Sequence, residues 1–575
     1  MRFGRRRFIQ GCGAWACTAF VPARAWMAGG GARGPADLVL ANADVWTGDP
    51  VRPGATAIAI RGSLIAGVGS LPELEKLSGP GTRIIDLGGR FAMPGLNDSH
   101  IHIARLAAQR PDVDLLGAAS LAEVLARLKT RADATPPGKW IKSRAQWHEA
   151  LLAESRMPTR FELDRVSEQH PIFLPRGGHV AAANSLALQL AGITDDTPDP
   201  PGGLYVRDGD GRILGVLLES ARRIVARLLP ALDEASYRRE LRALVAELNG
   251  YGLTSATNPS TLPYDLKQLA ALHEEGALSV RVHWTASIES TPAAVQELRQ
   301  RHARGDGDNR LCFSGIGEAP IDGGIEGAYL REPFELVPGE QNDPTYRGII
   351  VPAARDEDAL AAFYVEAARA GLNVMIHATG DGGLDRALSA CAKAARSADL
   401  RSLRWNLHGC FLVDDDQLAE IRRLGLAITA QAQPYLLGAQ MQKWWGAERT
   451  ARSIPIRAYI DAGITWAAGS DASAGIEVPM RSLGWMVNRR CLGGLQLDRR
   501  WGATVHEALT GYTQGSAWTQ FMDHAVGVLR PGMLADIAVF ASSPFKVNPA
   551  EIGELQADAT LLDGRPVFDR HGLFR

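Results

Sequence analysis

Hydrophobic and polar positions follow one rhythm near the ends of the chain and another in its middle. Near both ends, short apolar runs are separated by Gly, Asn and Asp, which is typical of β-strands joined by turns. Such runs fill residues 38–87 and return over residues 537–568. Because chain termini often meet in space, we expect segments 36–90 and 525–575 to form one composite β domain, a small β-sandwich.

The middle of the chain, residues 91–524, alternates strand-like with helix-like patterns. One helical segment, residues 356–371, has an apolar face and ends on Gly. Alternating strands and helices predict an α/β fold with a parallel sheet, and eight such strands predict a (β/α)8 TIM barrel. The predicted strands are 91–97, 254–257, 280–285, 313–317, 373–377, 404–408, 427–431 and 465–469.

The connection between the first two predicted strands is too long to be a loop. It leads to an inserted subdomain at about residues 104–250. Ser120 and Glu123 have the spacing of a capping box and predict the start of a helix there. The Pro-rich segment 197–203 predicts a rigid turn in the same subdomain.

The amino terminus reads as a targeting segment. Arg5 and Arg6 belong to a basic region that precedes an uncharged run, and Ala23-Arg24-Ala25 offers small residues around a cleavage point. This order is that of a secretory signal, and the paired arginines resemble a twin-arginine export signal. We therefore expect residues 1–25 to be a signal peptide that directs the protein to the bacterial periplasm through the twin-arginine machinery. A chance basic terminus and an uncleaved anchor are the alternatives.

Composition and charge narrow the remaining classes. The chain of 575 residues is 46% hydrophobic and 22% charged, like an average globular protein. Its net charge of -2 disfavours binding to nucleic acid through overall positive charge. No run of about 18 apolar residues appears, so we expect no stable membrane span. Four cysteines follow the predicted signal without a Cys-x-x-Cys pair, which favours free thiols: Cys312, Cys391, Cys410 and Cys491.

The sharpest chemical signal is a His-x-His pair that follows an apolar strand. His100 and His102 end the sequence PGLNDSHIH. Side chains two apart on a strand point to the same face, so both imidazoles can reach one metal ion. The carboxyl ends of barrel strands are also where barrel active sites lie.

Three further polar side chains end or follow predicted strands: His377, His408 and Asp471. One such histidine is more often a hydrogen-bonded core residue. Several imidazoles and a carboxylate at the same ends of parallel strands are better explained by a shared ion. Imidazole and carboxylate donors suit a divalent metal, above all zinc.

The chain resembles the amidohydrolase superfamily, specifically its YtcJ-like, amidohydrolase-3 branch, which includes N-substituted formamide deformylases. The resemblance runs from about Ala36 to Phe568. It rests on dispersed motifs that are specific for the family and say little about the substrate. These are ADLVLANAD at 36–44, PGLNDSHIH at 94–102, PDPPGG at 198–203, HATGD at 377–381, AGSD at 468–471 and GVLRPGMLAD at 527–536.

The resemblance implies a role for each candidate. His100 and His102 match the first-strand metal ligands, and His377 and His408 match those of the fifth and sixth strands. Asp471 matches the last-strand aspartate, which binds metal and shuttles the catalytic proton.

One position departs from the family pattern. Many relatives place a carbamylated lysine four residues before an Asp-Gly pair, where this chain has Glu318 before Asp322-Gly323. A glutamate can bridge two ions directly with its two oxygens. The alternative is that Glu318 is a polar loop residue beside a single ion, so the site holds one or two ions.

The implied reaction is hydrolysis of a non-peptide carbon–nitrogen bond, in an amide or a formamide, by metal-activated hydroxide. An ester hydrolase or isomerase on the same scaffold, and a non-catalytic binding protein, are the alternatives. The expected partner is a small-molecule amide, and a homodimer is left open. Candidate substrate contacts, each with a purely structural alternative, are Trp147, Arg176, His179 and Tyr435.

Overall fold

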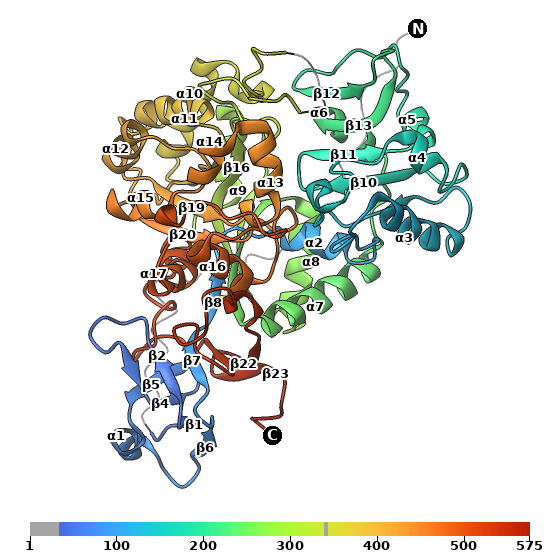
Figure 1. Ribbon diagram of the computed structural model, residues 1–575. Helices are drawn as coiled ribbons and strands as arrows, with labels where there is room; N and C mark the ends of the chain where they lie inside the picture. Colours follow the sequence, from blue (N-terminus) through green and yellow to red (C-terminus); the bar gives the residue numbers. More distant parts are fainter. Residues whose placement is uncertain (1–33, 339–342) are drawn as a thin grey trace.

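A computed structural model describes residues 34–338 and 343–575 of the chain. The predicted signal peptide, residues 1–25, lies outside the described residues. Figure 1 shows a barrel in the middle, a β-rich part that contains both described ends below it, and an inserted part at its side. The predicted α/β class with a barrel is confirmed.

Eight parallel strands form the barrel, in the order in which they follow along the chain. Backbone bonds connect the first strand to the last: Ser99 N–H donates to Ala468 O at 3.0 Å, and Asp471 N–H donates to His100 O at 2.8 Å. The strands are β8 (Leu96–Asp98), β14 (Leu253–Thr261), β15 (Arg281–Ala286), β16 (Leu311–Pro320), β17 (Asn373–Ala378), β18 (Asn406–Gly409), β19 (Ala427–Gln431) and β20 (Trp466–Gly469).

Helices cover the outside of the barrel, and α10 (Glu357–Arg369) illustrates why they form. The Asp356 side chain caps its first turn by accepting from Asp358 and Ala359 N–H. Its buried positions, which include Leu360, Phe363 and Ala367, recur at helical spacing and face the strands. The other covering helices include α8 (Pro263–Glu274), α9 (Pro292–Arg301), α11 (Asp381–Ala394), α12 (Asp415–Leu424) and α13 (Pro434–Trp445).

The first predicted strand, 91–97, is wrong as a single element, because the chain divides it at Gly95. Its first half, β7 (Phe91–Pro94), pairs antiparallel with β21 (Ile537–Phe540) in a different sheet, and only its second half is barrel strand β8. A Cβ on Gly95 would lie 2.2 Å from Thr254 Oγ1, so the crossing point between the sheets needs glycine. The apolar pattern is continuous across this point and could not reveal the division.

Both ends of the described chain contribute to two small sheets below the barrel (Figure 1). One has the order β5-β4-β1-β6 and the other β23-β22-β21-β7-β2-β3. They share a buried core that includes Leu40, Ile58, Ile537 and Leu561. The remaining strands are β1 (Leu38–Ala41), β2 (Asp44–Trp46), β3 (Gly54–Ala55), β4 (Ala57–Arg61), β5 (Leu64–Gly69), β6 (Arg83–Asp86), β22 (Ala557–Leu562) and β23 (Arg565–Asp569).

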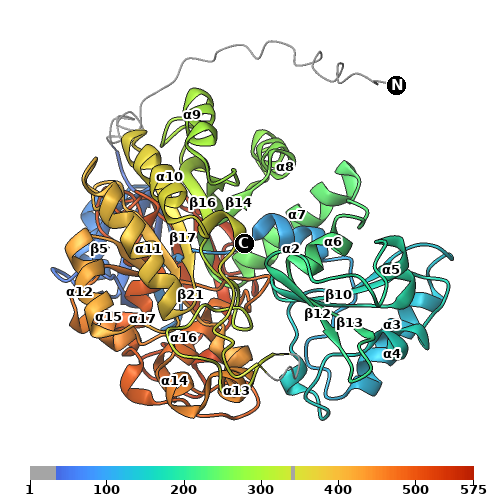
Figure 2. The same ribbon diagram turned by 90° about the horizontal axis from the view of Figure 1, so that it is seen from above.

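The inserted part lies beside the barrel and carries its own five-stranded sheet (Figure 2). Its order is β12-β13-β11-β10-β9. Ser120 Oγ accepts from Glu123 N–H at 3.2 Å at the start of α3 (Leu121–Asp133), as predicted. The sheet consists of β9 (Ile141–Lys142), β10 (Ile172–Arg176), β11 (Val180–Ala183), β12 (Gly203–Arg207) and β13 (Ile213–Glu219).

Two helices connect this insert to the barrel. The helices α2 (Ile103–Gln109) and α7 (Glu234–Gly250) pack on each other, and Tyr237 O–H donates to Ala104 O at 3.1 Å. The four cysteines predicted to be free thiols are buried and unpaired. Among the described residues, no helix is long and apolar enough to cross a membrane.

Candidate metal centre

His100 and His102 lie just beyond the end of β8, where the chain has already left strand geometry. Asp98, the last residue of that strand, accepts from His100 N–H and from Ser470 N–H, both at 3.0 Å. The same carboxylate therefore holds the ends of the first and last strands together. The two Nε2 atoms of the histidines lie 3.4 Å apart. The two rings therefore converge as predicted, although the residues lie outside the strand and its regular alternation of faces does not position them.

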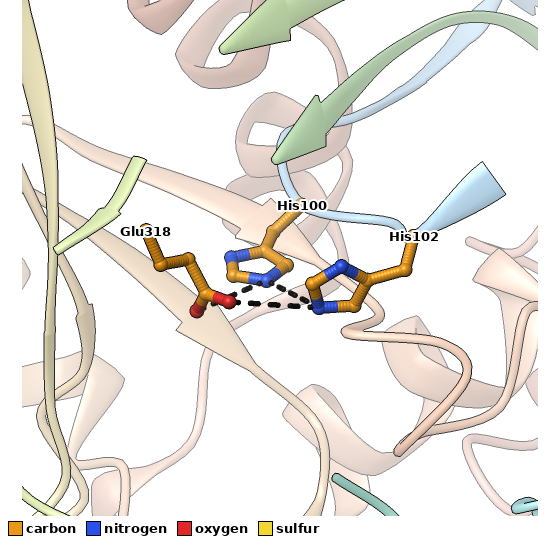
Figure 3. Close-up of side chains that lie close together, drawn as sticks. All are labelled: His100, His102 and Glu318. Carbon is orange, nitrogen blue, oxygen red and sulfur yellow. Dashed lines mark hydrogen bonds and ion pairs between the residues drawn. The ribbon is translucent and has the colours of Figure 1, made fainter. Parts of the chain in front are cut away.

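Two carboxylates face this histidine pair. Glu318, in β16, places Oε1 3.5 Å from His100 Nε2 and Oε2 3.7 Å from His102 Nε2. Asp471, just after β20, places Oδ1 3.3 Å from His100 Nε2 and 3.2 Å from His102 Nε2. Figure 3 shows His100, His102 and Glu318 pointing toward one another.

The separations between these donor atoms fit a small divalent cation. Zinc bonds nitrogen and oxygen at about 2.0–2.2 Å, which puts tetrahedral donors about 3.4 Å apart. Although burial alone would raise it, hydrogen bonds and charges from His100 and then His102 keep the pKa of Asp471 well below its usual range. Burial alone would also raise the pKa of Glu318, but the charge of His100 and the hydrogen bond with His377 lower it. Two ionised carboxylates and two imidazoles thus meet at one point.

His377, in β17, lies on the other side of Glu318. Its Nδ1 lies 3.3 Å from Glu318 Oε1, the oxygen that also faces His100. Its Nε2 lies 3.3 Å from Gly323 O and 3.2 Å from Thr379 Oγ1. Burial opposes a charge on this ring, but the hydrogen bond and charge of Glu318 raise the pKa of His377 to about 10. Glu318 therefore lies between the His100–His102 pair on one side and His377 on the other.

His408, in β18, lies beside His100 but has different partners. Its Nδ1 faces His100 Nδ1 at 2.5 Å, and its Nε2 bonds the Asn406 side chain. Both ring nitrogens of His408 are thus occupied by His100 and Asn406. The structure brings together five of the six predicted ligands and leaves His408 at their edge.

A small cavity of about 40 Å³ opens beside this centre. It is lined by His377 and Asp471 and by three of the four predicted substrate contacts, Trp147, Arg176 and His179. Trp147 Nε1–H donates to Pro175 O at 2.9 Å. Because so little space is available, the cavity holds a few water molecules or one small functional group.

Two of these contacts are anchored by buried carboxylates. Arg176 forms a bidentate pair with Glu149, with both bonds at 2.9 Å, and a further ion pair with Glu326. His179 Nδ1 lies 3.0 Å from Glu219 Oε2, which fixes the orientation of its ring.

Tyr435 does not line the cavity, and two glutamines before it do. Tyr435 lies near the start of α13 and packs against the barrel core, the structural alternative for this residue. Gln431 and Gln433 line the cavity instead, and Gln433 Nε2–H donates to Asp471 Oδ2 at 2.6 Å. The sequence could have indicated these two glutamines, because Gln-x-Gln at the end of a predicted strand has the same spacing as His-x-His. No comparable sequence pattern marks Glu219.

A family model and several known proteins are similar to this chain. The model of the Amidohydrolase family matches residues 83–568. The putative amidohydrolase YtcJ of Bacillus subtilis is 26% identical over 89% of this chain and 96% of its own length. The N-substituted formamide deformylase of Arthrobacter pascens is 27% identical over 93% of this chain and 99% of its own length.

Solved structures share the architecture. An uncharacterised metal-dependent hydrolase from Pyrococcus furiosus matches with a TM-score of 0.67 and 26% identity, over 88% of this chain and all (100%) of that chain. A variant of the atrazine chlorohydrolase from Arthrobacter aurescens, complexed with zinc and atraton, matches with a TM-score of 0.52 and 16% identity, over 93% of this chain and 95% of its own. The second likeness is one of fold.

Proposed function

Because the chain belongs to the amidohydrolase family, and is thus a metal-dependent hydrolase, we propose that it cleaves a non-peptide carbon–nitrogen bond in an amide or formamide-like substrate. The family match confirms the resemblance drawn from the sequence motifs. The cofactor is a divalent metal, and we propose zinc. The observation that carries the proposal is the convergence of two imidazoles and two carboxylates beside a small cavity.

His100, His102, Glu318 and Asp471 would hold this ion. When bound, such an ion lowers the pKa of water from about 15.7 towards 7 and polarises a carbonyl oxygen. Every donor atom of the four comes from the carboxyl end of a barrel strand or from the residues just after it. This is the rim at which barrel enzymes place their chemistry.

Asp471 acts as the proton shuttle in this proposal. Gln433 holds its Oδ2, while Oδ1 faces the two imidazoles. Because the carboxylate stays ionised, it can accept a proton from the attacking water. It then returns that proton to the leaving nitrogen, which needs it to depart as a neutral amine.

In the fuller form of the proposal, Glu318 would help to hold two ions. Its Oε1 lies near His100 and His377 and its Oε2 near His102, so the carboxylate lies between the two sides of the centre, where each of its oxygens could take one ion. The second ion would use His377 and, as the family implies, His408. For His408 to serve as a ligand, its ring must leave the contacts with His100 and Asn406.

The substrate contacts follow from the lining of the cavity. Glu219 holds Nδ1 of His179, so we propose that Nε2 of this ring meets the substrate carbonyl oxygen. Trp147 would pack against the substrate and limit the entry of water. Arg176 acts through its neighbours, since Glu149 and Glu326 already occupy its guanidinium.

A substrate panel tests the function. Zinc-supplied protein is incubated with N-alkyl formamides, N-alkyl acetamides and matched esters, and released amine and released acid are measured. Amine release that disappears in the His102→Ala variant supports the proposal. Acid release from esters alone would favour the esterase alternative, and product with the same mass as the substrate would favour an isomerase. Protein that binds amides but turns none over would be a binding protein.

We also propose that the protein is exported through the twin-arginine pathway, because Arg5 and Arg6 precede an uncharged run and an Ala-x-Ala site. A bacterial host that produces the full chain is separated into periplasm and cytoplasm. Replacing both arginines with lysine should keep the protein in the cytoplasm, and unchanged periplasmic recovery would exclude this route.

A further inference from the structure

We propose that a second, larger cavity, between the insert and the barrel, binds an apolar substituent of the substrate. This subsite deepens the proposed function and rests on it. The cavity measures about 440 Å³, within the range of small-molecule sites. The metal-side cavity of about 40 Å³ has room for the scissile group alone. A larger substrate therefore needs the neighbouring space.

One wall of this subsite is an aliphatic face of the inserted sheet. Side chains two apart on a strand share a face, and Leu214, Val216 and Leu218 of β13 line the cavity together. The neighbouring strands add Val180, which pairs with Leu218, and Val206. Five branched aliphatic side chains on adjacent strands thus form an apolar wall.

The opposite wall comes from the barrel. Leu336 and Val337 follow β16, the strand of Glu318, and Trp444 belongs to α13. Leu336 is 37% exposed, which is high for a leucine beside an apolar wall. A ligand between the walls would cover apolar surface that the protein itself leaves open. That burial favours a hydrocarbon group, because each buried methylene contributes about 0.8 kcal/mol.

The two cavities border one buried ion-pair cluster. Arg176 and Glu326 line both, and Glu149 lines the larger one. Each of these three residues is at most 4% exposed. A substrate with its scissile group at the metal centre would cross this cluster to reach the apolar wall.

The ion pairs of the cluster leave the apolar wall to determine selectivity. Glu149 and Glu326 both pair with Arg176, so the three side chains hold one another in place. The substrate class is therefore an amide with an uncharged apolar substituent.

Two hydroxamates test the subsite by binding, independently of turnover. Acetohydroxamate and octanohydroxamate share a metal-chelating head and differ only in the apolar tail. Isothermal titration of zinc-supplied protein should show octanohydroxamate binding at least about tenfold more tightly, because its extra methylenes become buried. Val216→Trp, which fills the cavity, should bring octanohydroxamate to the affinity of acetohydroxamate and leave acetohydroxamate unchanged.

Two further variants keep the result interpretable. Leu190→Trp adds the same ring at an exposed position of the insert and should behave like the wild type. Leu336→Trp narrows the cavity from the barrel side and should repeat the effect of Val216→Trp if that variant does not fold. Equal affinity for both hydroxamates in the wild type, or unchanged tail preference in both narrowed variants, would overturn the subsite alone. Failure of both hydroxamates to bind would overturn the metal centre of the proposed function together with the subsite.

Discussion

Asp471 and His100 are connected twice, through the backbone and through their side chains. The N–H of Asp471 donates to the carbonyl of His100 at 2.8 Å, and Oδ1 of Asp471 lies 3.3 Å from Nε2 of His100. The backbone bond closes the barrel, because the two residues follow its last and first strands. The geometry of the candidate centre is therefore fixed by the closure of the sheet.

Removing one imidazole of the centre should remove turnover without unfolding the chain. His100→Ala deletes a donor atom shared by Glu318 and Asp471, and we expect kcat/KM to fall by at least about 1000-fold because the ion supplies the activated water. Activity, metal content and circular dichroism are measured together. His524→Ala, at an exposed position, is the control and should retain wild-type activity. Full activity in the His100→Ala protein would remove that residue from the mechanism.

Changing the central carboxylate should lower the metal count. Glu318→Gln keeps the shape of the side chain and removes the charge that faces His100 and His377. If Glu318 bridges two ions, mass spectrometry of the metals should show about one equivalent fewer than in the wild type. Glu297→Gln, on an exposed helix face, should change nothing. In Glu318→Lys, unchanged metal content without a carbamate would contradict the bridge.

The joint between the barrel and the small sheets should depend on one buried ion pair. Arg281, in β15, donates to both oxygens of Asp536 at 2.7 and 2.9 Å. Arg281→Met leaves that carboxylate buried without a cationic partner, with the Asp563 N–H as its remaining donor, which should lower the free energy of unfolding by about 3–5 kcal/mol. Urea denaturation measures the change. Arg212→Met breaks an exposed ion pair and should have little effect on the free energy of unfolding. Equal losses of stability in both variants would contradict the role given to the buried pair of Arg281 and Asp536.

Gly95 should tolerate no side chain. In Gly95→Ala the new Cβ would meet Thr254 Oγ1 at 2.2 Å, and overpacking of this kind costs about 1–3 kcal/mol of stability. Thermal unfolding compares this variant with Gly81→Ala, where no atom lies within 4 Å of the added carbon. Equal melting temperatures in the two variants would show that the chain passes between the sheets without this constraint.

The barrel could be predicted from the sequence because each buried parallel strand is a short apolar run that a helix separates from the next. Seven of the eight predicted barrel strands lie where the pattern placed them, and the remaining one was divided. The division at Gly95 depends on pairing with Ile537–Phe540, more than 400 residues later in the chain. Local periodicity contains no information about so distant a partner.

The candidate centre was predictable for a similar reason. Polar side chains at the ends of apolar strands are unusual, and the strand ends of one barrel face the same rim. His100, His102, His377 and Asp471 could therefore be grouped from the sequence. The orientation of His408 toward His100 and Asn406 could not, since it depends on side-chain torsions. The same holds for Gln433, whose bond to Asp471 was missed although its spacing was visible.

The most direct test of the account is anomalous diffraction at the zinc absorption edge from crystals of zinc-supplied protein. We predict a peak about 2.0–2.2 Å from Nε2 of both His100 and His102, with an oxygen of Glu318 or Asp471 completing the contact. A second peak between Glu318 and His377 would establish the bridge. Absence of any peak within bonding distance of His100 and His102 would contradict the central claim.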